Sequence, residues 1–272
     1  MEPEILDLVL FVRNPSNVTR AVDAGIQSFM VDMEWRGKHD RQDGADTEID
    51  PATAADLEIV TREAGQRGAR VFCRINRFGP WTGEEVGHAV ECGVARIFLP
   101  MVTAVGEVEE FLGMVDGRCE TAILVETEEG VANAADIARL PLGAVYIGLN
   151  DLAISRGASN IFPPLIDGTI PRMRDVFAGR EFGFGGVTSV DGGWPLPCRM
   201  LLQEMARLQC GFSFLRRSFM SDLWPRPDLA QEIERVRAYL RLLAGRDNAS
   251  AMADHARLHE AVSGLLVPEP AK

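Results

Sequence analysis

The stretch LVETEEGVANAADIARLPLGAVYIGLNDLAISR, residues 124–156, decides the fold. It begins with an apolar run that ends at Glu126, continues through an alanine-rich segment typical of a helix, and closes with a second apolar run before Asp151. This order predicts strand, helix and strand, with an acid after each strand. Since the ends of parallel strands lie on one face, both carboxylates are predicted to converge on one divalent cation. On this pair alone, two acids facing water remain an alternative.

The same alternation of strand and helix extends through the chain. Eight apolar or alternating runs are predicted as strands, at residues 8–12, 26–34, 69–76, 95–102, 120–126, 144–149, 182–187 and 212–219. Eight such units within 272 residues favour a (β/α)8 TIM barrel in one domain. A doubly wound sheet is the main rival, but no Gly-x-Gly-x-x-Gly lies between a strand and a helix, which disfavours its nucleotide-binding form.

Cap residues predict where several helices begin. Ser16 is the expected cap of the first helix, Asp50-Pro51 start the second, and Thr82 to Glu85 have the spacing of a capping box. Residues 150–168 are predicted to form a loop that carries Asp151 and a short turn.

The C-terminal part is predicted to lie outside the barrel. We assign residues 1–246 to the barrel and 247–272 to a helical extension, whose helix at 249–266 has a partly apolar face with Leu258, Val262 and Leu265. A helix outside a closed barrel needs a surface to cover. A neighbouring subunit is one candidate, on which the extension packs or with which it is swapped, so we expect a homo-oligomer.

The composition excludes several classes of partner. A formal net charge of −12 without a dense basic patch argues against nucleic acid and an anionic membrane. The five cysteines have no C-x-x-C spacing and are expected to be reduced, and the N-terminal apolar run is too short for a signal peptide or membrane helix. We expect a cytoplasmic protein that binds a small molecule or another copy of itself.

Polar residues gather at the predicted strand ends. Glu34 ends the second predicted strand, Arg74 lies near the end of the third, Glu126 ends the fifth, and Asp151 follows the sixth. In barrels of this kind that end holds the active site. Mg²⁺ or Mn²⁺ is held by one or two carboxylates with water and substrate oxygens, and a nearby arginine suits a carboxylate or enolate. These residues indicate metal-assisted chemistry on a 2-oxo acid.

Five motifs at these strand ends resemble those of the HpcH/HpaI aldolase and citrate lyase family. They are VDME (31–34), RIN (74–76), FLPMV (98–102), VETEEGVAN (125–133) and IGLNDL (147–152). The resemblance implies that Glu126 and Asp151 bind Mg²⁺ (or Mn²⁺ or Co²⁺) and that Arg74 contacts the 2-oxo and enolate oxygen. It further implies that the backbone of Asn150 and Asp151 lies near the substrate carboxylate and that Glu34 orients metal-bound water. The expected activity is a carbon–carbon lyase acting through a metal-stabilised enolate of pyruvate or a related 2-oxo acid.

Two departures from the family leave the reaction open. Trp35 stands where the family's aldolases have an acid–base histidine, and their glycine-rich segment between the fourth and fifth strands is absent. Trp35 is expected as an apolar wall of the pocket. His39 lies with Arg36, Lys38 and Arg41 in a basic loop. Three interpretations of this loop are open: it replaces the acid–base role of the missing histidine, it recognises a substrate anion, or it faces solvent. A metal-dependent hydrolase, a decarboxylase, a phosphoenolpyruvate-linked enzyme and a catalytically idle binding or assembly barrel remain alternatives.

Overall fold

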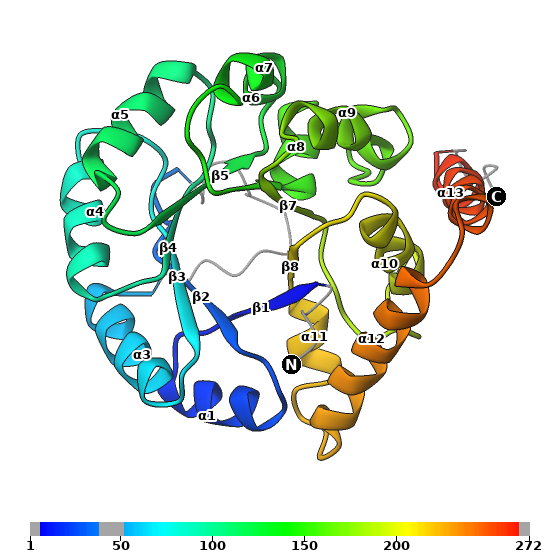
Figure 1. Ribbon diagram of the computed structural model, residues 1–272, viewed down its shortest axis with the longest axis horizontal. Coiled ribbons are helices and arrows are strands. Elements are labelled where there is room, and N and C mark those ends of the chain that lie inside the picture. The colour runs from blue at the N-terminus through cyan, green and yellow to red at the C-terminus, as the bar shows by residue number, and fades with distance from the viewer. Residues whose placement is uncertain (1–5, 38–51, 267–272) are drawn as a thin grey trace, which may run out of the picture.

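Eight parallel strands form a nearly closed barrel surrounded by helices (Figure 1). The computed structural model describes residues 6–37 and 52–266. Neighbouring strands follow the order β7-β6-β5-β4-β3-β2-β1-β8, so each strand lies beside its neighbour in the sequence. The strands are β1 Asp7–Phe11, β2 Ser28–Asp32, β3 Arg70–Arg74, β4 Arg96–Leu99, β5 Glu120–Val125, β6 Ala144–Ile147, β7 Glu181–Phe184 and β8 Phe212–Phe214. The predicted (β/α)8 TIM-barrel fold is confirmed.

The seam between β7 and β8 depends on a close approach of two backbones. A Cβ atom at Gly183 would lie 2.4 Å from the carbonyl oxygen of Phe212, so only glycine fits there. Beyond the strands, the Val187 amide donates a hydrogen bond of 2.9 Å to the Phe214 carbonyl oxygen. Val187 also pairs with Leu215 in a parallel bridge. These contacts hold the last two strands together.

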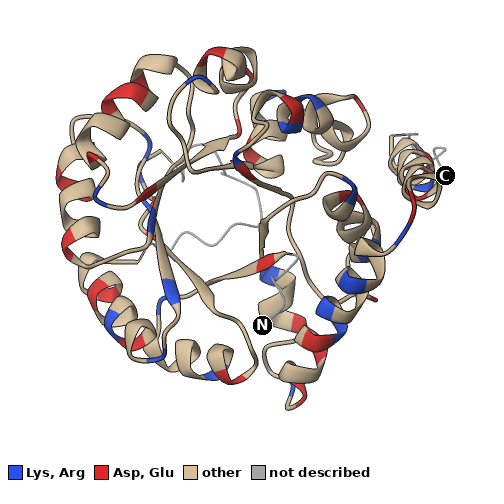
Figure 2. Ribbon diagram, in the orientation of Figure 1, with Lys and Arg blue, Asp and Glu red and all other residues tan. Residues whose placement is uncertain are grey.

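The helices form a ring outside the strands and carry most of the charged side chains (Figure 2). They are α1 Pro15–Asp23, α3 Ala54–Gln66, α4 Thr82–Glu91, α5 Val105–Val115, α6 Glu128–Ala132, α7 Ala134–Ile137, α8 Leu149–Ser155, the 3₁₀ helix η1 Pro163–Leu165, α9 Thr169–Val176, α10 Cys198–Arg207, α11 Arg217–Asp222 and α12 Leu229–Ala244. Their apolar faces pack against the outer side of the sheet. The side chains buried between the helices and the strands form the larger of two hydrophobic clusters.

The smaller cluster fills the interior of the barrel with aromatic side chains. Phe98, Phe212, Phe214 and Tyr146 lie there, and the Tyr146 and Phe214 rings stack with centroids 4.0 Å apart. Met30 of β2 also faces this interior, whereas its neighbours on the strand pack against the helices. The period-2 alternation of residues 26–34 separates Met30 from Phe29 and Val31, and the structure shows which of the two faces is the interior. The side chains make that interior a packed core rather than a pore.

Two of the predicted helix starts are wrong, and a third lies outside the described residues. The cap of α1 is Asn14, whose Oδ1 accepts from the Ser16 amide at 2.9 Å, because the helix already begins at Pro15. At α4, Glu85 does not close a capping box, since its carboxylate accepts hydrogen bonds from Asn76 instead. Asp50 and Pro51 are among the residues that the structure does not describe.

The start of α3 is set by Thr53. Its hydroxyl accepts from the Asp56 amide while Asp56 accepts from the Thr53 amide, which completes a reciprocal capping box. The helix therefore begins at Ala54.

Two segments contain more helix than the sequence predicted. Residues 150–168 were expected to be a loop, but α8 begins at Leu149, so Asp151 lies in the first turn of a helix. The eighth strand was predicted to reach residue 219, but β8 ends at Phe214 and α11 follows. In both places the chain turns into a helix directly at the barrel end.

The last helix, α13 (Asn248–Gly264), lies outside the ring in Figure 1 and packs on α10 and η1 of its own chain. Leu258 and Val262 are buried, and the His255 Nδ1 atom lies 3.1 Å from a carboxylate oxygen of Glu204 on α10. The division at residue 246 and the cover by a neighbouring subunit stay predictions. The homo-oligomer also stays a prediction, which light scattering tests. In the described part of the chain, no helix has the length and apolar character needed to cross a membrane.

Candidate active site

Arg74 and two acids meet where β2 and β3 end. Asp32 and Arg74 are opposite each other in the parallel register, and the guanidinium donates from Nε and Nη2 to the two Asp32 carboxylate oxygens at 2.9 and 2.7 Å. Its Nε atom also lies 3.6 Å from Oε2 of the buried Glu34. Burial alone would lower the pKa of Arg74, but the charges of these acids and of Glu126 raise that pKa well above its usual value. Arg74 is therefore a fixed cation.

Glu126 is a buried carboxylate directly after β5. Its Oε1 atom accepts a hydrogen bond of 3.0 Å from the Met101 amide, which comes from the end of β4. Burial, followed by the charges of Asp151 and Glu34, raises the pKa of Glu126 to about 8, although Arg74 and the Met101 hydrogen bond act in the opposite direction. The raised pKa means that the pocket disfavours a negative charge on Glu126 unless another cation is added.

Two backbone features make room for Glu126. A Cβ atom at Gly148 would lie 2.3 Å from the Glu126 Oε2 atom, so a side chain there would displace the carboxylate. Met101 has a φ of 55°, which lies in the left-handed region that non-glycine residues seldom adopt. Backbone strain of this kind gathers at functional sites, and here it belongs to the residue whose amide holds Glu126.

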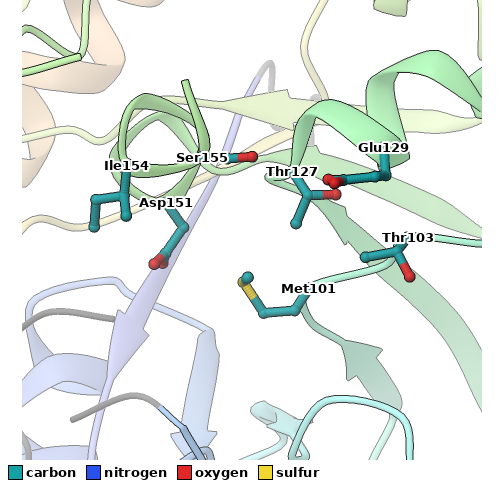
Figure 3. A pocket seen from close by; sticks show the side chains of 7 residues that line it. All are labelled: Met101, Thr103, Thr127, Glu129, Asp151, Ile154 and Ser155. Carbon is teal, nitrogen blue, oxygen red and sulfur yellow. The ribbon is translucent and has the colours of Figure 1, made fainter. Parts of the chain in front are cut away.

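Asp151 lies beside Glu126 and lines a cavity of about 420 Å³ (Figure 3). Asp151 is largely buried in the first turn of α8, directly beyond β6. The Thr127 side chain also lines this cavity, but its hydroxyl hydrogen is already donated to the Val102 carbonyl oxygen at 2.8 Å. The lining residues are Met101, Thr103, Thr127, Glu129, Asp151, Ile154 and Ser155, and none of them is basic.

Trp35 and Arg36 follow Glu34 and are held to the next strand end. Both of their amides donate to Oδ1 of Asn76, at 2.9 and 2.8 Å, and Asn76 is held in turn by Glu85 of α4. The Trp35 ring is half exposed and stacks on the Arg36 guanidinium. Trp35 is not one of the lining residues of the cavity, so its role as a pocket wall stays a prediction.

The remaining predicted site residues stand as follows. Asn150 is exposed in the first turn of α8, and its proposed backbone contact with substrate stays a prediction. His39 lies outside the described residues. Within residues 6–37 and 52–266, no group of three or more His, Cys, Asp or Glu side chains could hold a metal ion. Any cation at Glu126 and Asp151 would need further oxygen ligands from water or substrate.

The chain matches the family model described as HpcH/HpaI aldolase/citrate lyase over residues 8–162, which is more than half of its length. It belongs to the HpcH/HpaI aldolase/citrate lyase family. This membership supports an enzyme with a lyase or aldolase type of activity. Glu34, Arg74, Glu126 and Asp151 all lie within the matched part.

Solved structures with the same fold include members of this family and other enzymes. An HpcH/HpaI aldolase from Desulfitobacterium hafniense DCB-2 is 14% identical with a TM-score of 0.62, over 85% of this chain and 93% of that one. The citrate synthase SbnG is 15% identical with a TM-score of 0.62, over 85% and 94%. Macrophomate synthase is 14% identical with a TM-score of 0.58, over 89% and 87%. At these identities the likeness shows the fold alone, and a comparison with curated proteins gave no match.

Met101 and Gly148 are site residues that the sequence did not reveal. Gly148 ends an apolar run, which is a weak signal for a close approach to another group. Nothing in the sequence around Met101 marks its left-handed backbone or its bond to Glu126, because these depend on the neighbouring strand. Family membership and this geometry together identify the C-terminal end of the barrel as the candidate active site.

Proposed function

We propose that this chain is a divalent-metal-dependent carbon–carbon lyase that acts through the enolate of pyruvate or a related 2-oxo acid. The observation that carries the proposal is the buried Glu126 carboxylate, whose pKa is raised to about 8 beside Asp151 and Glu34. Burial makes the charged form of this carboxylate energetically costly, and such a cost is typical of a functional site where another group offsets it. A bound cation would stabilise the charged form of Glu126.

The donor atoms fit a hard divalent cation. Glu126 and Asp151 offer carboxylate oxygens, which Mg²⁺ prefers, and one or two carboxylates with water and substrate oxygens are its usual ligands. We assign Mg²⁺, with Mn²⁺ or Co²⁺ as substitutes, to these two residues. When bound, the cation supplies Lewis-acid stabilisation of the negative charge that develops on the 2-oxo oxygen.

The chain's own groups complete the binding of the 2-oxo acid. Asp32 accepts from Nε and Nη2 of Arg74, and the third guanidinium nitrogen, Nη1, is the proposed donor to the 2-oxo oxygen. The first amides of α8, at Asn150 and Asp151, have no acceptor within their helix and are proposed to donate to the substrate carboxylate. Glu34 helps to hold Arg74 and is proposed to orient a water molecule.

In the lyase direction, a 4-hydroxy-2-oxo acid is cleaved. Its C3–C4 bond breaks, the electron pair becomes the enolate of pyruvate, and the 4-hydroxyl group passes its proton to the water molecule that Glu34 is proposed to orient as the aldehyde forms. The enolate then takes a proton at C3 to give pyruvate. Arg74 assists by donating to the oxygen on which charge develops, a type of stabilisation that contributes a large part of enzymatic rate enhancement.

A decarboxylase is a second candidate, favoured by Trp35. This residue follows Glu34 directly, carries no titratable group and stacks on Arg36. Decarboxylation of a 2-oxo diacid such as oxaloacetate breaks the C3–C4 bond with loss of CO₂ and gives the same enolate. No hydroxyl proton has to be removed, so this reaction needs the metal site and Arg74 but no acid–base partner beside Glu34.

The test is deuterium exchange at the methyl group of pyruvate in D₂O, followed by NMR with Mg²⁺, Mn²⁺ and Co²⁺. We expect metal-dependent exchange in the wild type and its loss in Glu126→Gln. Glu120→Gln is the matched control, because Glu120 begins β5 at the opposite end of the barrel. Absence of exchange with all three cations would overturn the proposal. Turnover of oxaloacetate without cleavage of any 4-hydroxy-2-oxo acid would select the decarboxylase.

A further inference from the structure

Arg36 lies in a stack of aromatic side chains just beyond Glu34. Its guanidinium carbon is 4.3 Å from the ring centroid of Trp35 and 4.3 Å from that of Trp81. The Trp81 ring is itself fixed, since its Nε1–H donates to the Arg77 carbonyl oxygen at 2.9 Å. A Cβ atom at Gly79 would lie 2.6 Å from this ring, so the absence of a side chain there lets Trp81 lie flat. The stack joins the segment after β2, which carries Trp35 and Arg36, to the segment after β3, which carries Trp81.

The backbone that carries Arg36 is also fixed. The amides of Trp35 and Arg36 both donate to Oδ1 of Asn76. Asn76 donates to the Glu85 carboxylate twice, from the side-chain Nδ2 atom at 2.7 Å and from the backbone N–H at 2.9 Å. Arg36 is therefore a preorganised side chain rather than a freely moving surface arginine.

Within the described residues, the Arg36 guanidinium has no anionic partner. Its Nε atom is buried and makes no hydrogen bond in that part of the chain. Other arginines behave differently: Arg13 pairs with Asp56, Arg70 with Asp7, and Arg74 with Asp32. A buried donor without a partner requires an explanation, and a missing ligand is one. When aromatic rings cover its faces, a guanidinium still offers N–H groups in its plane, where they match a carboxylate or phosphate.

Arg36 also follows Glu34 of the candidate active site by two residues. Two residues of extended chain span at most about 7 Å, so its backbone lies close to that of Glu34. Glu34 in turn lies 3.6 Å from Arg74. The cavity beside Asp151 has no basic side chain among its lining residues, so it offers no cationic side chain to a second anionic group at the far end of the substrate.

We propose that Arg36 is a specificity-determining residue, which binds an anionic group at the end of the substrate remote from the 2-oxo acid. The shared chemistry is that of a carboxylate or a phosphate. This inference rests on the proposed lyase function and adds the substrate class to it. The Trp35–Arg36–Trp81 stack orients the guanidinium, and the anion satisfies its in-plane donors.

The test compares retro-aldol cleavage of three 4-hydroxy-2-oxo acids that differ at the far end. These are 4-hydroxy-2-oxopentanoate with a methyl group, 4-hydroxy-2-oxoglutarate with a carboxylate, and 4,5-dihydroxy-2-oxo-6-phosphohexanoate with a phosphate. We expect the wild type to prefer one of the two anionic substrates. Arg36→Met should lower kcat/KM for that substrate by about 10- to 100-fold, mainly through KM, because a charge-assisted hydrogen bond is lost. Cleavage of the methyl substrate should not change.

Two further variants make the test specific. Arg77→Met removes an exposed arginine from the same loop region and should alter none of the three rates. Arg36→Lys keeps a cation beside the rings but loses the planar donors, so it should recover only part of the preference. If Arg36→Met lowers all three rates equally, Arg36 has a structural role and the inference is wrong. If it lowers none of them, Arg36 does not contact the substrate and the inference is also wrong. If the wild type cleaves none of the three, the proposed lyase function itself fails.

Discussion

The two ends of the barrel both carry charged side chains, but these are paired differently. At the N-terminal end, the buried Arg96 begins β4 and donates to Glu120, which begins β5, at 2.9 and 2.6 Å. The same guanidinium also binds Glu181, which begins β7, and lies 5.0 Å from the Phe72 ring centroid. Both acids of this cluster therefore share one buried cation.

At the C-terminal end, carboxylates gather around one buried arginine. Asp32, Glu34 and Glu126 all raise the pKa of Arg74, and Asp151 adds to the negative charge near Glu126. The result is a carboxyl group whose pKa is raised to about 8. In a parallel barrel, the N-terminal end serves stability and the C-terminal end serves function. The difference in charge balance between the two ends follows this division.

The largest expected effect is that of removing Glu126. Glu126→Ala should lower kcat/KM for metal-dependent pyruvate exchange by about three orders of magnitude or more, because a metal ligand contributes several kcal/mol at the transition state. The measurement is exchange by NMR with saturating Mg²⁺. If Glu120→Ala at the other end of the same strand lowers exchange equally, the functional contrast between the two ends is wrong.

A more modest effect is expected from crowding Glu126. Gly148→Ala places a methyl group where the Glu126 Oε2 atom lies, so the carboxylate must move. We expect the affinity for Mn²⁺ to fall by about 10- to 100-fold, as when a metal ligand loses its support. Isothermal titration calorimetry measures this affinity. Gly113→Ala on α5 is the matched control, since a Cβ atom there meets nothing within 4 Å, and it should leave the affinity unchanged.

At the N-terminal end, a substitution should affect stability and not metal binding. Arg96→Met leaves Glu120 and Glu181 facing each other without their shared cation and should lower the free energy of unfolding by about 1–3 kcal/mol. Urea denaturation measures the loss. Arg62→Met, which removes an exposed pair with Glu58, should change stability by less than about 0.5 kcal/mol. Loss of Mn²⁺ binding in Arg96→Met would contradict the separation of the two ends.

The last expected effect is a pH dependence that belongs to the C-terminal end. The pKa of Glu126 rises from its usual 4.5 to about 8 on folding, so the folded state holds a proton that the unfolded chain releases. Without metal, stability should therefore fall as pH rises from about 4.5 to about 8, by about 1 kcal/mol or more. Urea denaturation across this range checks the slope. Glu126→Gln should remove it, and an unchanged slope in that variant would exclude Glu126 as its source.

Much of the fold was predictable because its signals are local. Alternation in residues 26–34 predicts that Met30 faces the opposite side of the strand from Phe29 and Val31, and the structure confirms this separation. Which side is the barrel interior was decided by the tertiary structure. Helix starts were less predictable, because more than one residue near each start could act as a cap. Asn14 caps α1 in place of Ser16. Glu85 was expected in a capping box but binds Asn76, a partner that becomes available only when α4 packs beside the end of β3.

The sequence by itself determined the barrel and the strand ends at which its acids and Arg74 lie, since strand and helix periodicities are properties of neighbouring residues. Only the tertiary structure decided how these residues act on one another. The Asp32–Arg74 pair depends on the register of β2 and β3, and the Met101 amide reaches Glu126 from 25 residues away because β4 lies beside β5. Burial, which raises the pKa of Glu126, exists only after the barrel has closed.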